Sequence, residues 1–306
     1  MPVIYPISSG KGGVGKSFIA ASIGTLFAKL GKKVVLVDLD LGASNLHTLL
    51  GIKNPKNGLN CFLNQTVKKL DRVAVPTIVS NLFFINSLYC SMEIANLYHT
   101  QKLKIIRAIT KLPFDYIILD LGAGSNFNTL DFFSTSQEGI IICTPEPTSI
   151  ENCFRFIKAA YLRKLKQIIK RYAFNSAVKN TVFSPNNKTM EAPDIIDVVL
   201  KHDPDRENFL KNKLSEFKFK LIINQFRKNI DETLGDKIET VCNRHFYSNF
   251  QFLGNISYDA RIPNSIVSKN IYVNKYPYTT SSIDLKKITE KITKNKHLTS
   301  QASKVS

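Results

Sequence analysis

Gly10-Lys11-Gly12-Gly13-Val14-Gly15-Lys16-Ser17 is the stretch that decides the fold of this chain. It fits the pattern G-x-x-x-x-G-K-[ST], in which successive backbone N–H groups point at phosphate oxygens. Pro2–Ile7 before it is a short apolar run that predicts a strand, and Phe18–Leu30 after it predicts a helix. A glycine-rich turn between a strand and a helix predicts a phosphate site, because the helix N-terminus adds positive potential. The alternative is a glycine-rich turn without a ligand.

Two side chains of this loop have predicted roles toward a nucleotide. Lys16 is expected against the β- and γ-phosphates, and the Ser17 hydroxyl is expected to bind Mg²⁺. The residues expected to surround the nucleotide here are Gly10, Lys11, Gly12, Gly13, Val14, Gly15, Lys16, Ser17 and Phe18.

Acidic residues follow two other apolar runs. Val34–Val37 and Tyr116–Leu119 are typical of strands buried on both faces of a parallel sheet, and Asp38 and Asp120 come directly after them. Ligands of open α/β sheets bind at the carboxyl ends of the strands, so both acids are expected to face the phosphate site. Asp120 matches a Walker B carboxylate, which holds a metal-bound water. Capping of a helix is the alternative for Asp38.

The rest of the first half continues this alternation of strands and helices. It predicts an α/β fold: a doubly wound, mostly parallel sheet with helices on both faces. The further strands are expected at Asn81–Asn86, Gly139–Thr144, Phe219–Asn224 and Phe250–Ile256. The further helices are expected at Ala95–Leu112, Leu130–Thr135, Ile150–Arg171 and Ser282–Asn295.

The polar segment Tyr172–Phe217 departs from the alternation and carries three prolines, with possible short helices at Ile195–Leu200 and Arg206–Leu214. Because the sheet is expected to resume at Phe219, we predict a single domain over residues 1–295 with an insertion at about 172–217. Residues 296–306 are polar and are expected to form a disordered tail.

The net charge of the chain indicates which macromolecules it could bind. Lysine and arginine outnumber acids 42 to 24, which gives a net charge of +18. Such an excess attracts polyanions such as nucleic acid or an anionic membrane, although a genome that favours lysine codons would produce it too.

The 5 cysteines form no C-x-x-C pair, which argues against a zinc knuckle, a disulfide framework or an iron–sulfur cluster. No apolar run is long enough to span a membrane, and no signal peptide is visible, so we expect a cytoplasmic protein.

Lys11, directly after the first glycine of the loop, makes it resemble the deviant Walker A motif of the MinD/ParA family of P-loop ATPases. Further segments resemble this family's motifs, and the chain as a whole is closest to MinD-like and FlhG-like members. The D-x-G-A-G form at Asp120 resembles FlhG more than the ParA partition proteins. The segments are Asp38–Asn45 (D-x-D-x-x-x-x-N), Asp120–Gly124, Thr144–Ile150 (T-P-E-P-x-S) and Leu221–Asn224. The resemblance implies a SIMIBI-type P-loop NTPase fold, with ATP and Mg²⁺ as cofactors.

The resemblance also implies roles for single residues. The catalytic residues would be Lys11, which reaches the partner's phosphates across a dimer interface, Lys16, and Asp40, which positions the attacking water. Ser17, Asp38 and Asp120 would hold the metal. Asn45 would stabilise its loop when the γ-phosphate is present, and Asn224 would hydrogen-bond adenine. Thr144–Ile150 would be structural, turning the chain into the next helix.

The function that the resemblance implies is an ATP-dependent dimerisation switch in spatial positioning of a flagellum or pole, a septum site or DNA. Hydrolysis would be slow and stimulated by an activating protein partner, and the ATP-bound form would be a homodimer. Non-specific DNA is a further expected partner, and the membrane surface is a less favoured one. The expected cytoplasmic location therefore includes peripheral association with the inner membrane or the nucleoid. A metabolic synthetase or a tyrosine kinase on the same core is the alternative; the kinase reading rests on Tyr272, Tyr276 and Tyr278.

Overall fold

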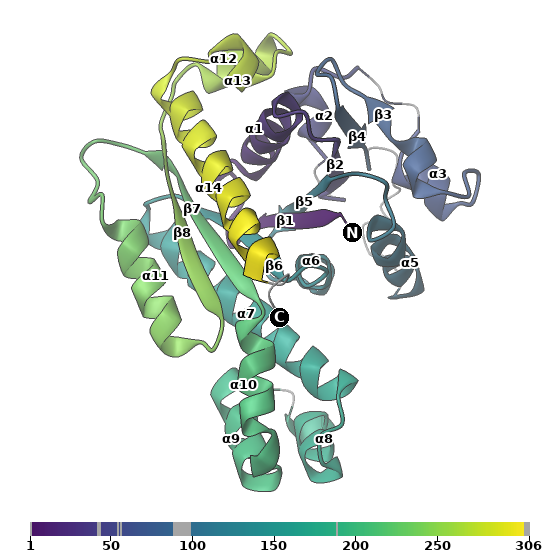
Figure 1. The fold of residues 1–306 in the computed structure, drawn as a ribbon, viewed down its shortest axis with the longest axis vertical. Helices are drawn as coiled ribbons and strands as arrows, with labels where there is room; N and C mark the ends of the chain where they lie inside the picture. The colour runs from purple at the N-terminus through teal and green to yellow at the C-terminus, as the bar shows by residue number, and fades with distance from the viewer. Residues whose placement is uncertain are drawn as a thin grey trace.

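The centre of the protein is one sheet of eight strands (Figure 1). The computed structural model describes residues 2–41, 44–53, 55, 57–87, 99–187 and 189–302, with only the backbone at 186 and 295–302. The strand order is β3-β4-β2-β5-β1-β6-β7-β8, and all neighbours pair in parallel except β3 and β4. The strands are β1 Val3–Ser9, β2 Val34–Leu39, β3 Val75–Pro76, β4 Leu82–Ile85, β5 Tyr116–Ala123, β6 Glu138–Cys143, β7 Lys218–Phe226 and β8 Asn249–Ser257.

Helices cover both faces of this sheet. They are α1 Lys16–Lys29, α2 Leu46–Leu49, α3 Leu59–Leu63, η1 Leu70–Val73, α5 His99–Ile109, α6 Phe127–Phe133, α7 Pro147–Arg171, α8 Ser176–Val182, η2 Pro185–Asn187, α9 Ala192–His202, η3 Pro204–Arg206, α10 Glu207–Ser215, α11 Leu234–His245, α12 Ile262–Val267, α13 Tyr272–Lys275 and α14 Thr280–Ala302. The predicted doubly wound α/β fold is therefore confirmed. The prediction missed β3, since two edge residues that include a proline produce no periodic pattern.

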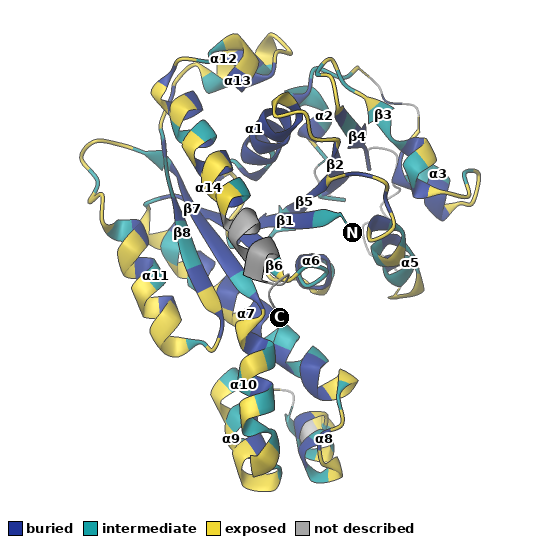
Figure 2. Cartoon of the chain, viewed as in Figure 1, coloured by how far each residue is buried: buried dark blue, intermediate teal, exposed yellow. Residues whose placement is uncertain are grey.

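Two apolar cores flank the sheet, because successive strand residues point to opposite faces. On β2, Val35 and Val37 enter the core that contains α5, α6, α7 and α11. Val34 and Leu36 enter the other core, which contains α1 and α14. Figure 2 shows the central strands almost wholly buried between the two helical layers. This burial explains why the strands are continuous apolar runs in the sequence.

The segment between α7 and β7 forms a small helical bundle beside the sheet (Figure 1). Helices α8, α9 and α10 pack against the C-terminal half of α7 around a separate apolar core. Its buried members include Leu165 and Ile169 of α7 and Val178, Val199 and Leu214 of the added helices. The chain then re-enters the sheet, with Lys218 of β7 beside Glu138 of β6. We call this unit the α8–α10 bundle; α8 was not predicted from the sequence.

Most predicted boundaries differ from the observed ones by a few residues, and the largest difference is at the C-terminal helix. Helix α14 runs to Ala302, so the backbone of residues 296–302 is helical where a disordered tail was expected. Residues 296–302 contain neither glycine nor proline, the residues that most often end a helix. The helix expected from Ala95 is described only from His99, because residues 95–98 lie outside the described residues. One of the 5 cysteines, Cys90, lies outside them too. In the described part of the chain, no helix is both long and apolar enough to cross a membrane.

Candidate functional site

The loop between β1 and α1 has the backbone shape that its glycines predict. Gly13 and Gly15 have φ angles of +79° and +91°, a left-handed conformation that L side chains rarely adopt. Gly15 precedes α1 and has no side chain to cap it, so no capping side chain competes with an anion for the N–H groups of the first turn. Lys16 is buried at the start of α1, and Ser17 follows it at the inner end of the loop.

Gly10 brings the same loop into contact with α7. A Cβ atom at this position would lie 1.9 Å from the backbone carbonyl oxygen of Asn152. Real Cβ atoms essentially never come this close to another heavy atom, and a backbone oxygen has little freedom to move away. Only glycine therefore fits between the loop and the first turns of α7.

Asp38 and Asp120 lie side by side beneath the loop. They are partners in the register between the neighbouring strands β2 and β5, and both are almost fully buried. Burial raises the pKa of Asp120 to about 8, and the charge of Asp38 adds to that rise; the nearby Ser17 hydroxyl and Lys16 ammonium partly oppose it. Burial also raises the pKa of Asp38 to about 6, against a hydrogen bond from Ser44.

The environment of this acid pair fits a divalent cation. Neither carboxylate oxygen of Asp120 has a hydrogen-bond partner among the described residues. Buried, unsatisfied carboxylates are costly, and Mg²⁺ is a hard cation that prefers such oxygen ligands and retains several waters. The predicted metal residues Ser17, Asp38 and Asp120 are thus brought together, and their chemistry suits Mg²⁺.

Asp40 and Asn45, both from the segment after β2, lie in different environments. Asp40 lies near the acid pair: its backbone N–H donates to Asp38 Oδ1 at 3.1 Å, and a Cβ on Gly122 would meet its carboxylate oxygen at 3.4 Å. Asn45 is exposed at the start of α2, and its side chain does not cap that helix. Residues 42 and 43, between them, lie outside the described residues.

Lys11 forms its contacts within its own chain. Its Nζ lies 3.1 Å from Glu146 Oε2 and 3.3 Å from Thr148 Oγ1, and its side chain is 42% exposed. Glu146 and Thr148 belong to the Thr144–Ile150 segment, which turns β6 into α7. Sequence reasoning assigned this segment only a structural role and missed these two partners, since they are far from Lys11 in the sequence.

Asn224 contacts the loop from β7. It is buried, and its Nδ2 donates to the Val14 carbonyl oxygen at 2.8 Å. The next residue, Gln225, donates from Nε2 to the Gly13 carbonyl oxygen at 3.3 Å. These two amides thus tie the loop to β7. The adenine contact of Asn224 stays a prediction, and Gln225 is a residue that the sequence analysis missed.

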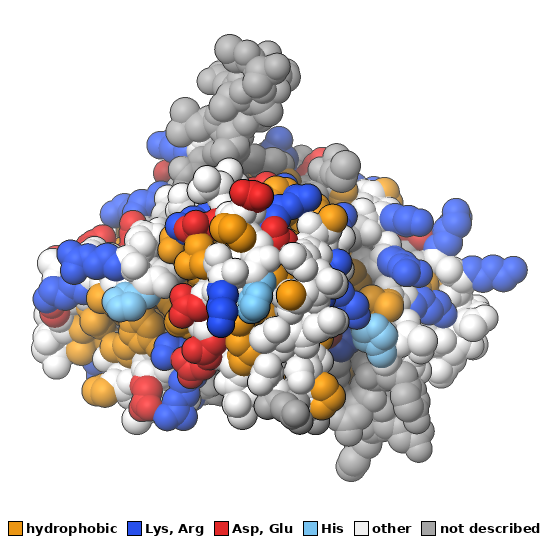
Figure 3. Space-filling model, turned by 90° about the horizontal axis from the view of Figure 1, so that it is seen from below, with side chains coloured by type: hydrophobic (Ala, Val, Ile, Leu, Met, Phe, Trp, Pro, Cys, Tyr) orange, Lys and Arg blue, Asp and Glu red, His pale blue; other side chains and the backbone are white. Residues whose placement is uncertain are grey.

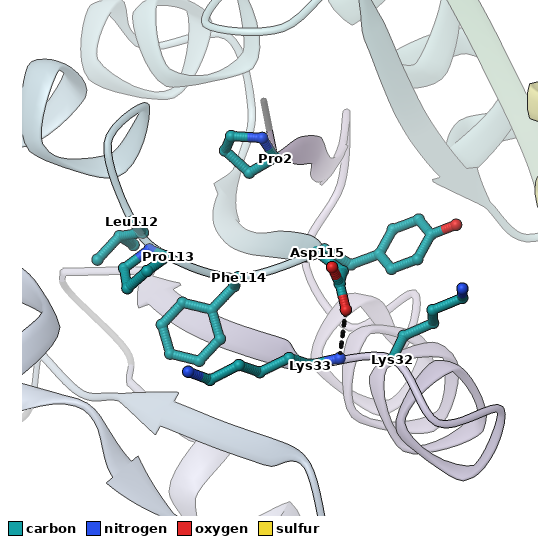
Figure 4. Close-up of a pocket in the computed structure, with 8 residues that line it drawn as sticks. Pro2, Lys32, Lys33, Leu112, Pro113, Phe114 and Asp115 are labelled. Carbon is teal, nitrogen blue, oxygen red and sulfur yellow. Dashed lines mark hydrogen bonds between the residues drawn. The ribbon is translucent and has the colours of Figure 1, made fainter. Parts of the chain in front are cut away.

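A separate cavity of about 410 Å³ lies at the other end of the sheet (Figure 4). It is lined from the N-terminal ends of β1, β2 and β5 by residues that include Pro2, Lys33 and Asp115. The Lys33 backbone N–H donates to Asp115 Oδ2 at 2.8 Å, the dashed bond of Figure 4. No predicted site residue lines this cavity, so it is not part of the candidate site.

Comparison with known proteins gives a family and a fold. A family model described as the CobQ/CobB/MinD/ParA nucleotide binding domain matches residues 6–271. The chain is 29% identical over 184 residues to the septum site-determining protein MinD of Synechocystis sp., an alignment that covers 55% of this chain and 64% of that protein. It is 31% identical over 167 residues to MinD of Helicobacter pylori, covering 51% and 58%. The chain thus spans less than two thirds of the length of these relatives.

Solved structures share the fold at low sequence identity. MinD from Pyrococcus horikoshii, complexed with Mg-ADP, superposes with a TM-score of 0.64 at 18% identity and covers 95% of this chain and 96% of its own. A ParA family ATPase from Chlorobium tepidum superposes with a TM-score of 0.62 at 19% identity, covering 94% and 99%. At such identities the likeness concerns the fold alone.

Proposed function

This chain belongs to the CobQ/CobB/MinD/ParA family of nucleotide-binding domains, and from that we propose that it is an ATPase in which ATP joins two copies of the chain. The observation that carries the proposal is the buried pair Asp38 and Asp120 beneath a glycine loop that also presents Lys11. Membership of this family and the relation to MinD proteins support a role in spatial positioning.

The residues of the site divide the work of phosphoryl transfer. The loop N–H groups and Lys16 would bind the phosphates, and Ser17, Asp38 and Asp120 would hold Mg²⁺. When bound, Mg²⁺ neutralises charge that develops on the phosphate oxygens. Asp40, beside the acid pair, would orient the attacking water. Binding of the cation also favours the ionised form of Asp38 and Asp120, which burial alone disfavours.

Lys11 is the residue that would make hydrolysis depend on a second copy. Its ion pair with Glu146 is largely exposed, and exposed pairs contribute only about 0–1 kcal/mol. A triphosphate of a partner chain is a stronger ligand for an ammonium group than one solvated carboxylate. We therefore infer that Lys11 exchanges Glu146 for the partner's phosphates when the ATP dimer forms.

Macromolecular partners follow from the same proposal. MinD of Aquifex aeolicus, a structural neighbour, has been solved in complex with MinC, which supports a protein partner here; that this partner activates hydrolysis is part of the proposal. The net charge of +18 supports non-specific DNA as a second partner. Membrane docking through the apolar face of α14 is disfavoured, since Leu285, Ile288 and Ile292 are buried against the sheet.

The alternative enzyme classes gain no specific support. Of the three tyrosines that suggested a kinase, Tyr272 is buried, and its hydroxyl contacts Asp259 and Thr279, whereas Tyr278 is exposed. The α8–α10 bundle, where a synthetase would need its second substrate site, is packed around an apolar core.

The decisive experiment measures molecular mass in solution with Mg²⁺ and either ATP or ADP. With ATP, the Asp40→Ala variant is expected at about 69 kDa, twice the 34.5 kDa of one chain, because nucleotide binds but is not cleaved. With ADP it should stay at the mass of one chain. Lys16→Ala should bind neither nucleotide in calorimetry, and Lys29→Ala, on the last turn of α1, is the matched control. An Asp40→Ala protein that stays monomeric in ATP would refute the dimer switch.

A further inference from the structure

A groove of about 460 Å³ lies between α5, α6, α7 and the end of α8. One side is apolar and is formed by Leu103 and Ile106 of α5 and by Phe183, which is 45% exposed. The other side is basic and is formed by Arg163, Lys166 and Lys170 of α7. These three cations recur at intervals of three and four residues, so they line one face of the helix.

A buried acid fixes the position of two cations at this groove. Asp131 of α6 is almost fully buried and forms ion pairs with both Lys102 of α5 and Arg163 of α7, the latter at 2.6 Å. One carboxylate between two cations leaves a net positive charge. Lys166 and Lys170 form no ion pair within the described part of the chain, and they add to it.

A polar group at the groove also lacks a partner. The Ser134 hydroxyl is buried and has no hydrogen bond among the described residues. A buried hydroxyl without a partner costs free energy that a ligand group could recover. Apolar walls, a basic rim and a buried hydroxyl without a partner among the described residues thus meet in one place.

This combination fits one class of ligand better than others. A nucleic acid backbone offers negative charge but no aliphatic groups for Leu103, Ile106 and Phe183 to contact. An amphipathic helix with an apolar stripe and acidic flanks offers both, in the way that helices dock into apolar grooves. The volume is within the usual range of about 300–1,000 Å³ for ligand pockets and has room for a few side chains.

We propose that this groove binds an acidic amphipathic segment of a partner protein. Its apolar side chains lie against Leu103, Ile106 and Phe183, and its carboxylates face Arg163, Lys166 and Lys170. Phe183 follows α8, so the α8–α10 bundle supplies one wall of the groove. The proposal does not depend on nucleotide binding, because Arg163 lies about 24 Å along α7 from its N-terminal end.

The test uses a fluorescein-labelled peptide of leucine and glutamate, with leucines at i, i+3, i+4, i+7 and i+8. Fluorescence anisotropy should show that Lys166→Glu/Lys170→Glu weakens binding at least tenfold. The matched control is Lys158→Glu/Lys201→Glu, the same charge change at two exposed lysines outside the groove, which should change affinity less than twofold. A peptide of identical composition with scattered leucines should bind at least tenfold more weakly.

A second variant separates the apolar part from the charged part. Phe183→Ser should weaken peptide binding about fivefold at low and at high salt, whereas the effect of Lys166→Glu/Lys170→Glu should shrink as salt rises. Circular dichroism establishes that each variant is folded. The proposal is overturned if the wild type does not bind the peptide at millimolar concentration, if the scattered peptide binds equally, or if both double variants lose affinity alike. A labelled 20-bp duplex that loses binding only with the groove variant would make the groove a nucleic acid site instead.

Discussion

At the residue scale, the two buried carboxylates are the most unusual feature of the molecule. Asp38 and Asp120 adjoin in neighbouring strands, and Asp120 lacks hydrogen-bond partners in the described structure. Natural proteins keep such groups where function requires them, since an apolar pair would be more stable. The site therefore lowers the stability of the nucleotide-free protein.

The burial of Asp120 makes the stability of the nucleotide-free protein depend on pH. The pKa of Asp120 rises from its usual 3.8 to about 8. At a pH between these two values, Asp120 is therefore protonated in the native state and ionised in the unfolded state. Stability is therefore greatest at the acidic end of this window and falls as pH rises through it. Asp120→Asn should remove most of the fall above pH 6, where Asp38, with a pKa of about 6, adds little, and stabilise the nucleotide-free protein at pH 8 by on the order of 1–3 kcal/mol.

Thermal unfolding from pH 6 to pH 8, without nucleotide and with EDTA, measures this effect. Asp205→Asn, an exposed residue of η3, is the control and should follow the wild type. Addition of Mg²⁺ and ATP should stabilise the wild type but not Asp120→Asn. If Asp120→Asn is less stable than the wild type at pH 8, the carboxylate is stabilising and the site has been misjudged.

At the element scale, α7 connects the nucleotide loop with the α8–α10 bundle. Gly10→Ala would force its Cβ into the Asn152 carbonyl and push the loop away from α7. We expect a loss of about 1–3 kcal/mol in the free energy of unfolding, together with loss of ATP binding. Gly12→Ala is the matched control for stability, because nothing lies within 4 Å of the added carbon. Equal denaturation midpoints for the two variants would contradict the close contact.

The other end of α7 gives a separate prediction. Leu165 is fully buried in the core of the α8–α10 bundle, and Leu165→Ala should cost about 2–5 kcal/mol. Hydrogen exchange should accelerate in α8 and α9 while β1 stays protected, because the bundle has its own core. Leu200→Ala, at a residue of α9 that is 38% exposed, should change little. Uniform acceleration through β1 would mean that sheet and bundle unfold as one unit.

Sequence reasoning succeeded where the signal is local. The loop from Gly10 to Ser17 and the apolar runs before Asp38 and Asp120 are contiguous, and their geometry follows from residue type and spacing. It failed where contacts join distant segments: nothing near Lys11 indicates Glu146, and nothing near Gly13 indicates Gln225. Helix α8 was missed since its few apolar residues are buried by other helices, α7 before it and α9 after it, and give no clear pattern of their own.

At the scale of the whole molecule, positive charge dominates. Figure 3, which faces the end formed by the α8–α10 bundle, shows lysine and arginine side chains gathered on the right of the view with few acids among them. A surface of this kind attracts polyanions over a distance that salt shortens.

This charge predicts DNA binding that depends on nucleotide. Because pairing of two chains doubles the charge that meets one duplex, retardation of a duplex should be stronger with ATP than with ADP. Affinity should fall about tenfold or more between 50 and 200 mM salt. The monomeric Lys16→Ala protein serves as the control and should behave like the ADP form. Retardation that is equal in ATP and ADP would show that the charge acts without the switch.

Helix α7 extends without a break from the turn at Glu146 to Arg171. A rod of this size is about 36 Å long, so a tilt of about five degrees at its first turn would displace its last turn by about 3 Å. A small tilt of α7 beside the bound triphosphate would thus shift the α8–α10 bundle by a distance comparable to the diameter of a methyl group. Spin labels on α9 and β8, read as a distance with and without ATP, would register that leverage.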